Sequence, residues 1–268
     1  MKRRTFIQTT AAALAEYRCP PLLAQEKKTP ARRVWGRSAN PYVEPSGIEP
    51  ITGVLPTFSP LGGAAMSGAF AAQYSLLAWG MAAAKSKNKP MGSMKVNFSQ
   101  GTVQTVEKRD GNVRSPSCTI KTSVLFGGKN NATRQWTLES LVDGRAHVRF
   151  VEKGVWDGKT ITVKANSFSR QYATKNTLIH RWALLPLLAS GRIKKTPLVF
   201  DMLDDSAHRP NQTLRYEGES EIPVQGGTAT FDSYVQTGYG ILPIHYLVDA
   251  QRRVQLITMA TVNWVLTG

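Results

Sequence analysis

The chain has 268 residues, and 41% of them are hydrophobic, which suffices for one ordinary domain with extensions and excludes a globally disordered protein. Its 34 Lys and Arg outnumber its 18 Asp and Glu to give a net charge of +16, and the cationic excess lies within residues 1–200. Such a balance fits a partner with an anionic surface, such as nucleic acid, acidic lipid or cell-wall polymer. Basic residues spread singly over solvated strand faces would give the same total, and this interpretation is favoured because no run of five like charges occurs.

The first residues carry the parts of an export signal. Arg3 and Arg4 precede Phe6, a short apolar run follows, and the tract closes on small residues at Ala24. A charged start, an apolar middle and a small-residue end are typical of a secretory leader. The paired arginines resemble the twin-arginine leader of bacteria, which implies transient contact with the twin-arginine export machinery and a periplasmic or envelope location. We expect residues 1–24 to form this signal, with a disordered basic N-terminus as the alternative.

Residues 25–93 are expected to precede the main domain as a tether and an apolar segment. Six prolines fall within residues 30–60, without a sustained period of 2 or 3.6, which is typical of an extended linker. Residues 61–84 carry no charge and are rich in Ala and Gly. They exceed the roughly 20 residues that cross a bilayer, but they are only weakly hydrophobic. We therefore favour a helix packed on the domain over a membrane anchor, with a poorly ordered segment as a further alternative.

From residue 94 to residue 268 the sequence indicates antiparallel strands joined by tight turns. Ile161 and Val163 alternate with Thr162 and Lys164, which predicts one buried and one solvated face. Gly-containing dipeptides between β-prone runs predict hairpins. The five dipeptides are Asp110-Gly111, Gly127-Gly128, Asp143-Gly144, Asp157-Gly158 and Gly226-Gly227.

One segment departs from this pattern. Asn176 is a helix-capping residue, and the apolar residues after it recur at helical spacing. Pro186 forbids an unbroken helix, so we predict a kink or a second short helix that ends near Gly191. The predicted order is therefore strands, one broken helix, and strands again over residues 198–266.

The C-terminal third carries a family resemblance. Residues 211–216 and 238–249, with the hairpin residues Tyr246, Asp249 and Arg253, resemble exported bacterial proteins of unknown function that are related to the lipoprotein-carrier superfamily. Proteins of that superfamily curl an antiparallel sheet into an open half-barrel around helices and hold an acyl chain in its concave apolar face.

This resemblance implies an α+β fold, mainly antiparallel β: a curved sheet or half-barrel with one broken helix packed in its concavity. It also implies a non-catalytic envelope protein that binds an apolar or lipid-like ligand and needs no cofactor. The residues expected to contact that ligand are Trp182 and Leu185 on the helix, with Tyr234 and Tyr246 on strands. Asp249 and Arg253 are as well explained by a role in fixing their turn as by a role in binding.

Reactive constellations are sparse. Asp201, Asp204, Asp205 and His208 form the one dense cluster of potential metal ligands, but their spacing matches no known metal loop, so a solvated acidic loop is favoured. Residues 154–160 resemble a phosphate loop with one residue too few between the glycines, and a hairpin tip explains them better. We expect no metal site and no catalytic residue.

Two other functions stay open at this stage. An uncharacterised hydrolase-type enzyme could assemble its residues only in the folded state, because no Gly-x-Ser-x-Gly motif exists and Cys118 has no histidine nearby in the chain. A basic scaffold could bind an anionic cell-envelope polymer through a charged sheet face. Aromatic and basic residues also interleave as they do on single-strand nucleic-acid platforms, but export makes nucleic acid an unfavoured partner.

Overall fold

The computed structural model describes residues 33–34, 58–66, 68–78, 90–111, 116–128, 131–145, 148–194, 196–259 and 262–268. All of them belong to one unit, Arg32–Gly268. The expected export signal, with Arg3, Arg4, Phe6 and Ala24, lies outside the described residues.

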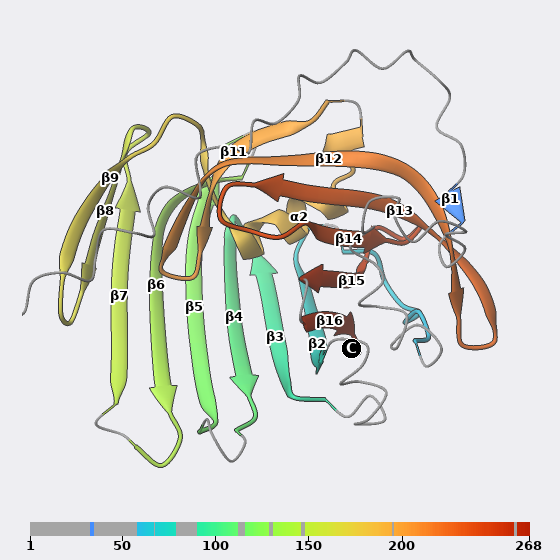
Figure 1. Ribbon diagram of the computed structural model, residues 1–268, viewed down its shortest axis with the longest axis horizontal. Helices are drawn as coiled ribbons and strands as arrows, with labels where there is room; N and C mark the ends of the chain where they lie inside the picture. Colours follow the sequence, from blue (N-terminus) through green and yellow to red (C-terminus); the bar gives the residue numbers. More distant parts are fainter. Residues whose placement is uncertain are drawn as a thin grey trace, which may run out of the picture. The chain divides into compact units, whose positions relative to one another are not determined.

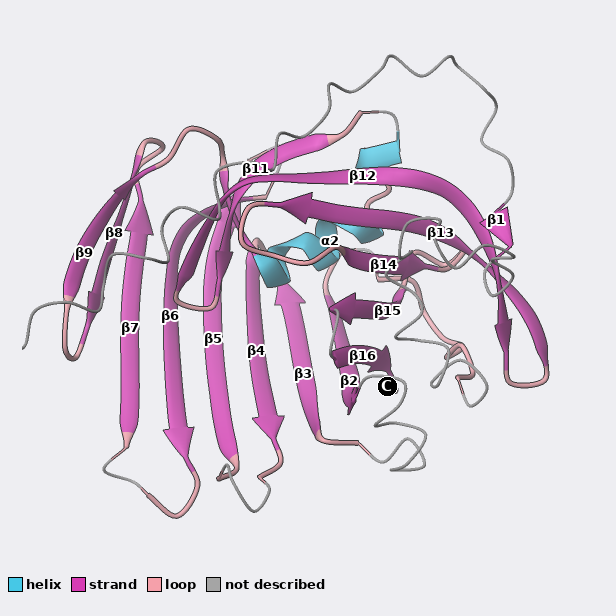
Figure 2. Ribbon diagram, viewed as in Figure 1, coloured by secondary structure: helices cyan, strands magenta, loops and turns pink. Residues whose placement is uncertain are grey.

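Sixteen strands of the described residues join in one sheet (Figures 1 and 2). The first group comprises β1 (Arg33–Val34), β2 (Phe70–Ala78), β3 (Gly92–Ser99), β4 (Thr102–Arg109), β5 (Cys118–Gly127), β6 (Ala132–Val142), β7 (Arg149–Trp156), β8 (Thr160–Ala165) and β9 (Ser169–Ala173). The second comprises β10 (Leu178–His180), β11 (Leu198–Asp204), β12 (Ala207–Val224), β13 (Gly227–Gly238), β14 (Ile244–Val248), β15 (Val254–Met259) and β16 (Val262–Leu266).

The sheet consists of two antiparallel meanders joined through their first and last strands. Strands β2 to β9 pair in chain order, and so do β11 to β16. The two meanders meet where β16 pairs with β2, as in the register pair Trp264 and Leu76. Two pairings are parallel: β10 with β11, and the short β1 with β12. Figure 1 shows β3 to β7 side by side, with β11 to β13 running across them.

The far end of the sheet bends back toward its middle but does not close. Strand β10 is the edge strand at one end of the sheet. It lies against the start of β6, where the His180 backbone N–H donates to Thr133 Oγ1 at 2.7 Å. This side-chain bond replaces the ladder that would complete a barrel, and β7 to β9 continue beyond it. The result is an open, curved, mainly antiparallel sheet.

A short helical segment fills the interior of this curve. A 3-10 helix (Arg181–Ala183), the helix α2 (Leu184–Ala189) and a second 3-10 helix (Arg192–Lys194) connect β10 to β11. All six residues of α2 are buried. Trp182 packs edge-on against Trp264, with ring centroids 6.1 Å apart. Because so little of the described chain is α-helical, the fold is better described as mainly antiparallel β than as α+β.

Two apolar clusters hold the sheet on its two faces. The larger lies on the inner face and includes α2. The smaller lies on the other face of β13 to β16 and includes Phe58, Phe231, Leu247 and Leu256. Every residue of β14 is therefore buried, which explains why its sequence lacks alternation. The segment that contains Phe58 and Leu61 is attached to β15 by Gln255. The Gln255 side chain donates to Leu61 O at 2.9 Å and accepts from Leu61 N at 3.0 Å.

The predicted hairpins are confirmed. Each of the five Gly-containing dipeptides lies at the connection between two antiparallel strands of the sheet, although Gly127 and Gly227 are themselves terminal strand residues. At Asp157 the side chain accepts from the backbone N–H groups of Lys159 and Thr160, both at 2.8 Å. These bonds hold a hairpin tip, as expected, where a phosphate loop was the rejected alternative.

The prediction of a helix within residues 61–84 is wrong for the described residues. Residues 70–78 form strand β2, which pairs with β16 on one side and β3 on the other. The strand joins the sheet although it precedes residue 94, where the β domain was expected to begin. No helix among the described residues has the length and hydrophobicity that a membrane span requires. Residues 79–84 lie outside the described part of the chain.

The predicted broken helix begins later than expected, which is a second correction. Asn176 caps no helix; its side-chain amide donates to Asp201 Oδ1 at 2.9 Å, and the next residues form β10. His180 is the residue that caps the 3-10 helix, because its Nδ1 accepts from Trp182 N. Pro186 lies in the first turn of α2, where its missing N–H costs nothing, and the segment is divided into short helices rather than one unbroken helix. The helical segment turns at Gly191 with φ at +68°, as predicted.

Candidate functional site

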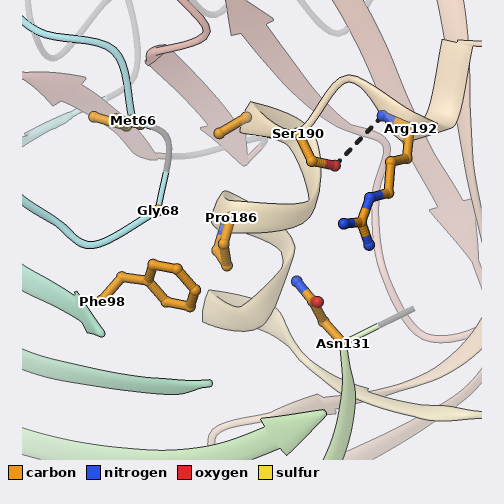
Figure 3. Close-up of a pocket in the computed structure, with 8 residues that line it drawn as sticks. Met66, Gly68, Phe98, Asn131, Pro186, Ser190 and Arg192 are labelled. Carbon is orange, nitrogen blue, oxygen red and sulfur yellow. Dashed lines mark hydrogen bonds between the residues drawn. The ribbon is translucent and has the colours of Figure 1, made fainter. Parts of the chain in front are cut away.

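The end of helix α2 forms one wall of an open cavity (Figure 3). Ser190 ends the helix, and its hydroxyl donates to Leu187 O at 2.6 Å. The left-handed backbone of Gly191 then turns the chain, and Arg192 N donates to Ser190 Oγ at 3.4 Å. This turn places a serine hydroxyl and an exposed arginine beside the apolar surface of the helix.

The cavity has a volume of about 230 Å³. It is lined by Met66, Gly68, Phe98, Asn131, Pro186, Ala189, Ser190 and Arg192. Sites for whole drug-sized molecules measure roughly 300–1,000 Å³. The cavity is therefore suited to one part of a ligand, such as the end of an alkyl chain, with the remainder outside.

Phenylalanine rings form the sheet side of the cavity. Phe98 on β3 is the register partner of Phe70 on β2, and the two ring centroids lie 5.2 Å apart. On its other side Phe98 stacks on Phe126 of β5, at 5.4 Å and an interplanar angle of 13°. The three rings hold one another in place, so the Phe98 wall is preformed rather than created by a ligand.

Asn131 attaches the turn between β5 and β6 to the helical segment. Its side-chain amide donates to Ala183 O at 3.3 Å, and its backbone has a positive φ of 51°. Asn tolerates this conformation better than most residues because its short polar side chain bonds locally. The site thus combines an aromatic wall, an apolar helix end and a polar rim, from four segments that are distant in sequence.

The four residues predicted to bind a ligand lie elsewhere, in the packed core. Leu185 and Tyr234 are fully buried, Trp182 is 3% exposed and Tyr246 is 4% exposed. The structure brings Trp182 and Tyr246 together around a space of about 10 Å³, which holds one water molecule at most. None of the four lines the cavity at the end of α2, and their role in ligand binding stays a prediction.

A hydrogen bond holds the Tyr246 side chain in place, and a contact between aromatic rings holds that of Tyr234. The Tyr246 hydroxyl donates to Gln236 Oε1 at 2.8 Å, and Gln236 in turn donates to Gln212 Oε1 at 3.2 Å. The Tyr234 ring lies 5.2 Å from the ring of Tyr216. Burial raises the pKa of both hydroxyls, that of Tyr234 to about 12, so both stay protonated at neutral pH. These tyrosines act here as neutral core residues.

Arg181 organises a buried ion network that the sequence did not indicate. Its guanidinium contacts Asp204 Oδ1 at 2.8 Å, Glu107 Oε2 at 3.2 Å and Asp205 Oδ2 at 3.5 Å, and it stacks on the Trp182 ring at 4.2 Å. Burial opposes its charge, but the three carboxylates outweigh burial and raise the pKa of Arg181. The network ties the 3-10 helix to β4 and to the β11–β12 turn, which is a structural role.

The prediction of a solvated acidic loop around Asp201 is also wrong. Asp201 lies within β11 and is 1% exposed, and only the turn beyond Asp204 is a loop. Asp201 accepts from Asn176, from the Asn211 backbone N–H at 3.0 Å and from the Lys175 backbone N–H at 3.3 Å. Burial alone would raise its pKa, but these bonds outweigh burial and lower it. Among the described residues, no group of three or more His, Cys, Asp or Glu side chains is placed to hold a metal ion.

Asp249 and Arg253 fix the turn between β14 and β15. Asp249 Oδ2 accepts from Arg253 Nε at 2.8 Å and from Gln255 at 2.6 Å, and Asp249 Oδ1 accepts from Arg253 N at 2.9 Å. Both residues are buried. Of the two roles left open by the sequence, the geometry supports the turn-fixing one.

Cys118 has no sign of activation. It lies at the start of β5, where burial raises the pKa of its thiol. A nucleophilic cysteine requires the opposite shift.

The comparisons with known proteins agree with the fold. No protein-family model matches the sequence, and no curated protein is similar to it. The structure is similar to the crystal structure of a β-barrel-like protein of the domain of unknown function DUF1849 from Brucella abortus, with a TM-score of 0.51 and 11% sequence identity. The match covers 75% of this chain and 96% of that one. At this identity the likeness concerns the fold alone: the chain shares the architecture of a bacterial β-barrel-like protein of unknown function.

Proposed function

We propose that the protein is an exported envelope protein that binds the apolar part of a lipid-like ligand, without catalysis, in the cavity at the end of α2. One observation carries this proposal: a preformed cavity of about 230 Å³ opens between the half-buried Phe98 and the buried Pro186 and Ala189. Apolar walls with a few polar groups at the rim are typical of sites for small amphiphiles. The predicted relation to lipoprotein carriers and the predicted export signal support the same function.

The chemistry of binding follows from the lining. An alkyl chain inserted between Phe98 and Pro186 would remove apolar surface from water on both partners, at about 25 cal/mol per Å². The headgroup would stay outside the apolar walls, near Ser190 and the exposed Arg192. Because the cavity is small, we expect selectivity for a single chain end over a bulky ring system.

Native mass spectrometry of the protein purified from the envelope, followed by solvent extraction, tests the proposal. The expected result is an additional discrete mass that extraction identifies as a lipid. Ala189→Leu, which adds three carbons to the cavity wall, should abolish that mass. Ala71→Leu adds the same atoms at an exposed position of β2 and should retain it. A bare protein mass in all three proteins would contradict the proposed function.

A further inference from the structure

The outward face of strands β3 to β8 is strongly and unevenly charged. Strands β3 to β8 lie side by side (Figure 1). Alternation along each strand places one set of side chains outward, and the strand registers arrange them in rows across the sheet. One row contains Lys95, Val106, Lys121, Glu139 and Val151; the next Asn97, Gln104, Ser123, Thr137, Lys153 and Lys164; the third Thr102, Leu125, Gln135, Val155 and Thr162. We call this surface the basic face.

The lysines of the basic face have no ion-pair partner among the residues that the structure describes. The basic face carries five exposed lysines. They are Lys95, Lys108, Lys121, Lys153 and Lys164. Within the described part of the chain, none of the five makes an ion pair, and the one outward carboxylate of these strands, Glu139, is already paired with Arg149 at 2.7 Å. The field of the lysines therefore extends into solvent.

Two of the lysines stand directly opposite each other. Lys153 on β7 and Lys164 on β8 are register partners, and both line a shallow hollow of about 610 Å³. Like charges at directly opposite positions destabilise a sheet. No neighbouring group of the described chain offsets this repulsion, so an external anion would stabilise the pair.

Exposed aliphatic side chains accompany the lysines. Val155 is 50% exposed, Leu125 is 40% exposed, and both line the same hollow; Val106 is 36% exposed between Lys95 and Lys121. Among the described residues, the one aromatic residue in the lining of the hollow, Trp136, is only 2% exposed, so the basic face lacks an exposed ring on which nucleic-acid bases could stack. Lysines interspersed with aliphatic side chains suit an interface between anionic headgroups and acyl chains.

We propose that the basic face docks on the surface of an anionic phospholipid membrane. The lysines neutralise headgroup phosphates, and Leu125 and Val155 reach the apolar boundary beneath them. The charge complementarity carries this inference. It goes beyond the proposed function, because the basic face is on the opposite side of the sheet from Phe98 and the cavity, and it needs no ligand there.

Cosedimentation of the full chain with vesicles tests the inference. We expect binding to vesicles of phosphatidylcholine with phosphatidylglycerol, little binding to phosphatidylcholine alone, and a steep loss with added salt. Lys153→Gln with Lys164→Gln should weaken binding about thirtyfold, since each lysine near an anionic surface contributes about 1 kcal/mol. Arg145→Gln with Lys175→Gln removes the same charge from exposed positions outside the hollow and should have a much smaller effect.

Three results would overturn the inference. The full chain could fail to bind anionic vesicles, or the two double variants could lose binding equally, which would indicate net charge alone. A basic face that binds single-stranded DNA or an anionic polysaccharide but no vesicle would assign it to a polymer. Thermal unfolding of each variant checks that it is folded. Ala189→Leu should bind vesicles normally, which separates this test from that of the cavity.

Discussion

The contact between Gly154 and Trp136 predicts a large effect from the addition of a single methyl group. A Cβ at Gly154 would lie 2.0 Å from Trp136 Cζ2 and 2.3 Å from two further ring atoms. The ring cannot move freely, because it is buried and its Nε1 donates to Glu152 Oε1 at 2.8 Å. Gly154→Ala therefore pushes the indole into its packed surroundings and breaks this bond.

Two costs add up to the expected loss in the free energy of unfolding of Gly154→Ala. Overpacking of a well-packed site costs about 1–3 kcal/mol. Glu152 is fully buried, and its Oε2 has no partner among the described residues. Loss of the indole bond would therefore leave its carboxylate without a hydrogen bond, which costs about 1–3 kcal/mol more. We expect a loss of about 4 kcal/mol in the free energy of unfolding, and a fall in Tm of about 10 °C.

Urea denaturation, followed by circular dichroism, measures this loss. Gly127→Ala is the matched control, because a Cβ at Gly127 meets nothing within 4 Å, and it should change stability by less than about 1 kcal/mol. In a Trp136→Leu background the colliding ring atoms are absent, so Gly154→Ala should cost much less. Equal costs in the two backgrounds, or a cost below 1 kcal/mol in the natural chain, would refute the reasoning.

Three further predictions concern charge and export. Arg181→Gln removes one of the two guanidinium partners of the buried Glu107, leaving Arg109, and should cost about 1.5–3 kcal/mol by urea denaturation, against little change for a charge removed at the surface. Burial, and then the charge of Arg181, lowers the pKa of His180 from 6.5 to about 3. The neutral His180 therefore contributes to the free energy of unfolding above pH 6.5. This contribution is lost as the pH falls toward 3, with a slope of at most about 1.4 kcal/mol per pH unit. His180→Asn, whose amide oxygen can accept the same capping bond, should flatten that slope between pH 6.5 and 4; an unchanged slope would exclude His180 as its source. Arg3→Lys with Arg4→Lys should retain the protein in the cytoplasm in cell fractionation, and normal export would contradict a twin-arginine leader.

Local signals in the sequence predicted the hairpins well. An Asp-Gly or Gly-Gly dipeptide supplies the left-handed backbone that a tight turn needs, and Gly128, Gly144 and Gly158 all have positive φ. Alternation then predicts which residues face the core, as at Ile161 and Val163, which are buried. Both signals act over a few residues, so tertiary structure has little opportunity to override them.

The missed elements depend on distant partners. Residues 70–78 include three alanines and read as weakly helical, but Trp264 and Val265 of β16 pair with them across the whole length of the domain. The cavity has the same origin: Phe98, Asn131 and Pro186 lie far apart in sequence and meet only in the folded chain. No periodicity or spacing marks such residues as neighbours.

A crystal structure of the protein with a bromine-labelled fatty acid tests the central claim most directly. Anomalous scattering locates the bromine directly. The account predicts a bromine peak beside Phe98 and Pro186 in the cavity at the end of α2, and no such peak in crystals of Ala189→Leu. The absence of a peak at that position in the natural protein, or a peak that persists unchanged in the variant, would contradict it.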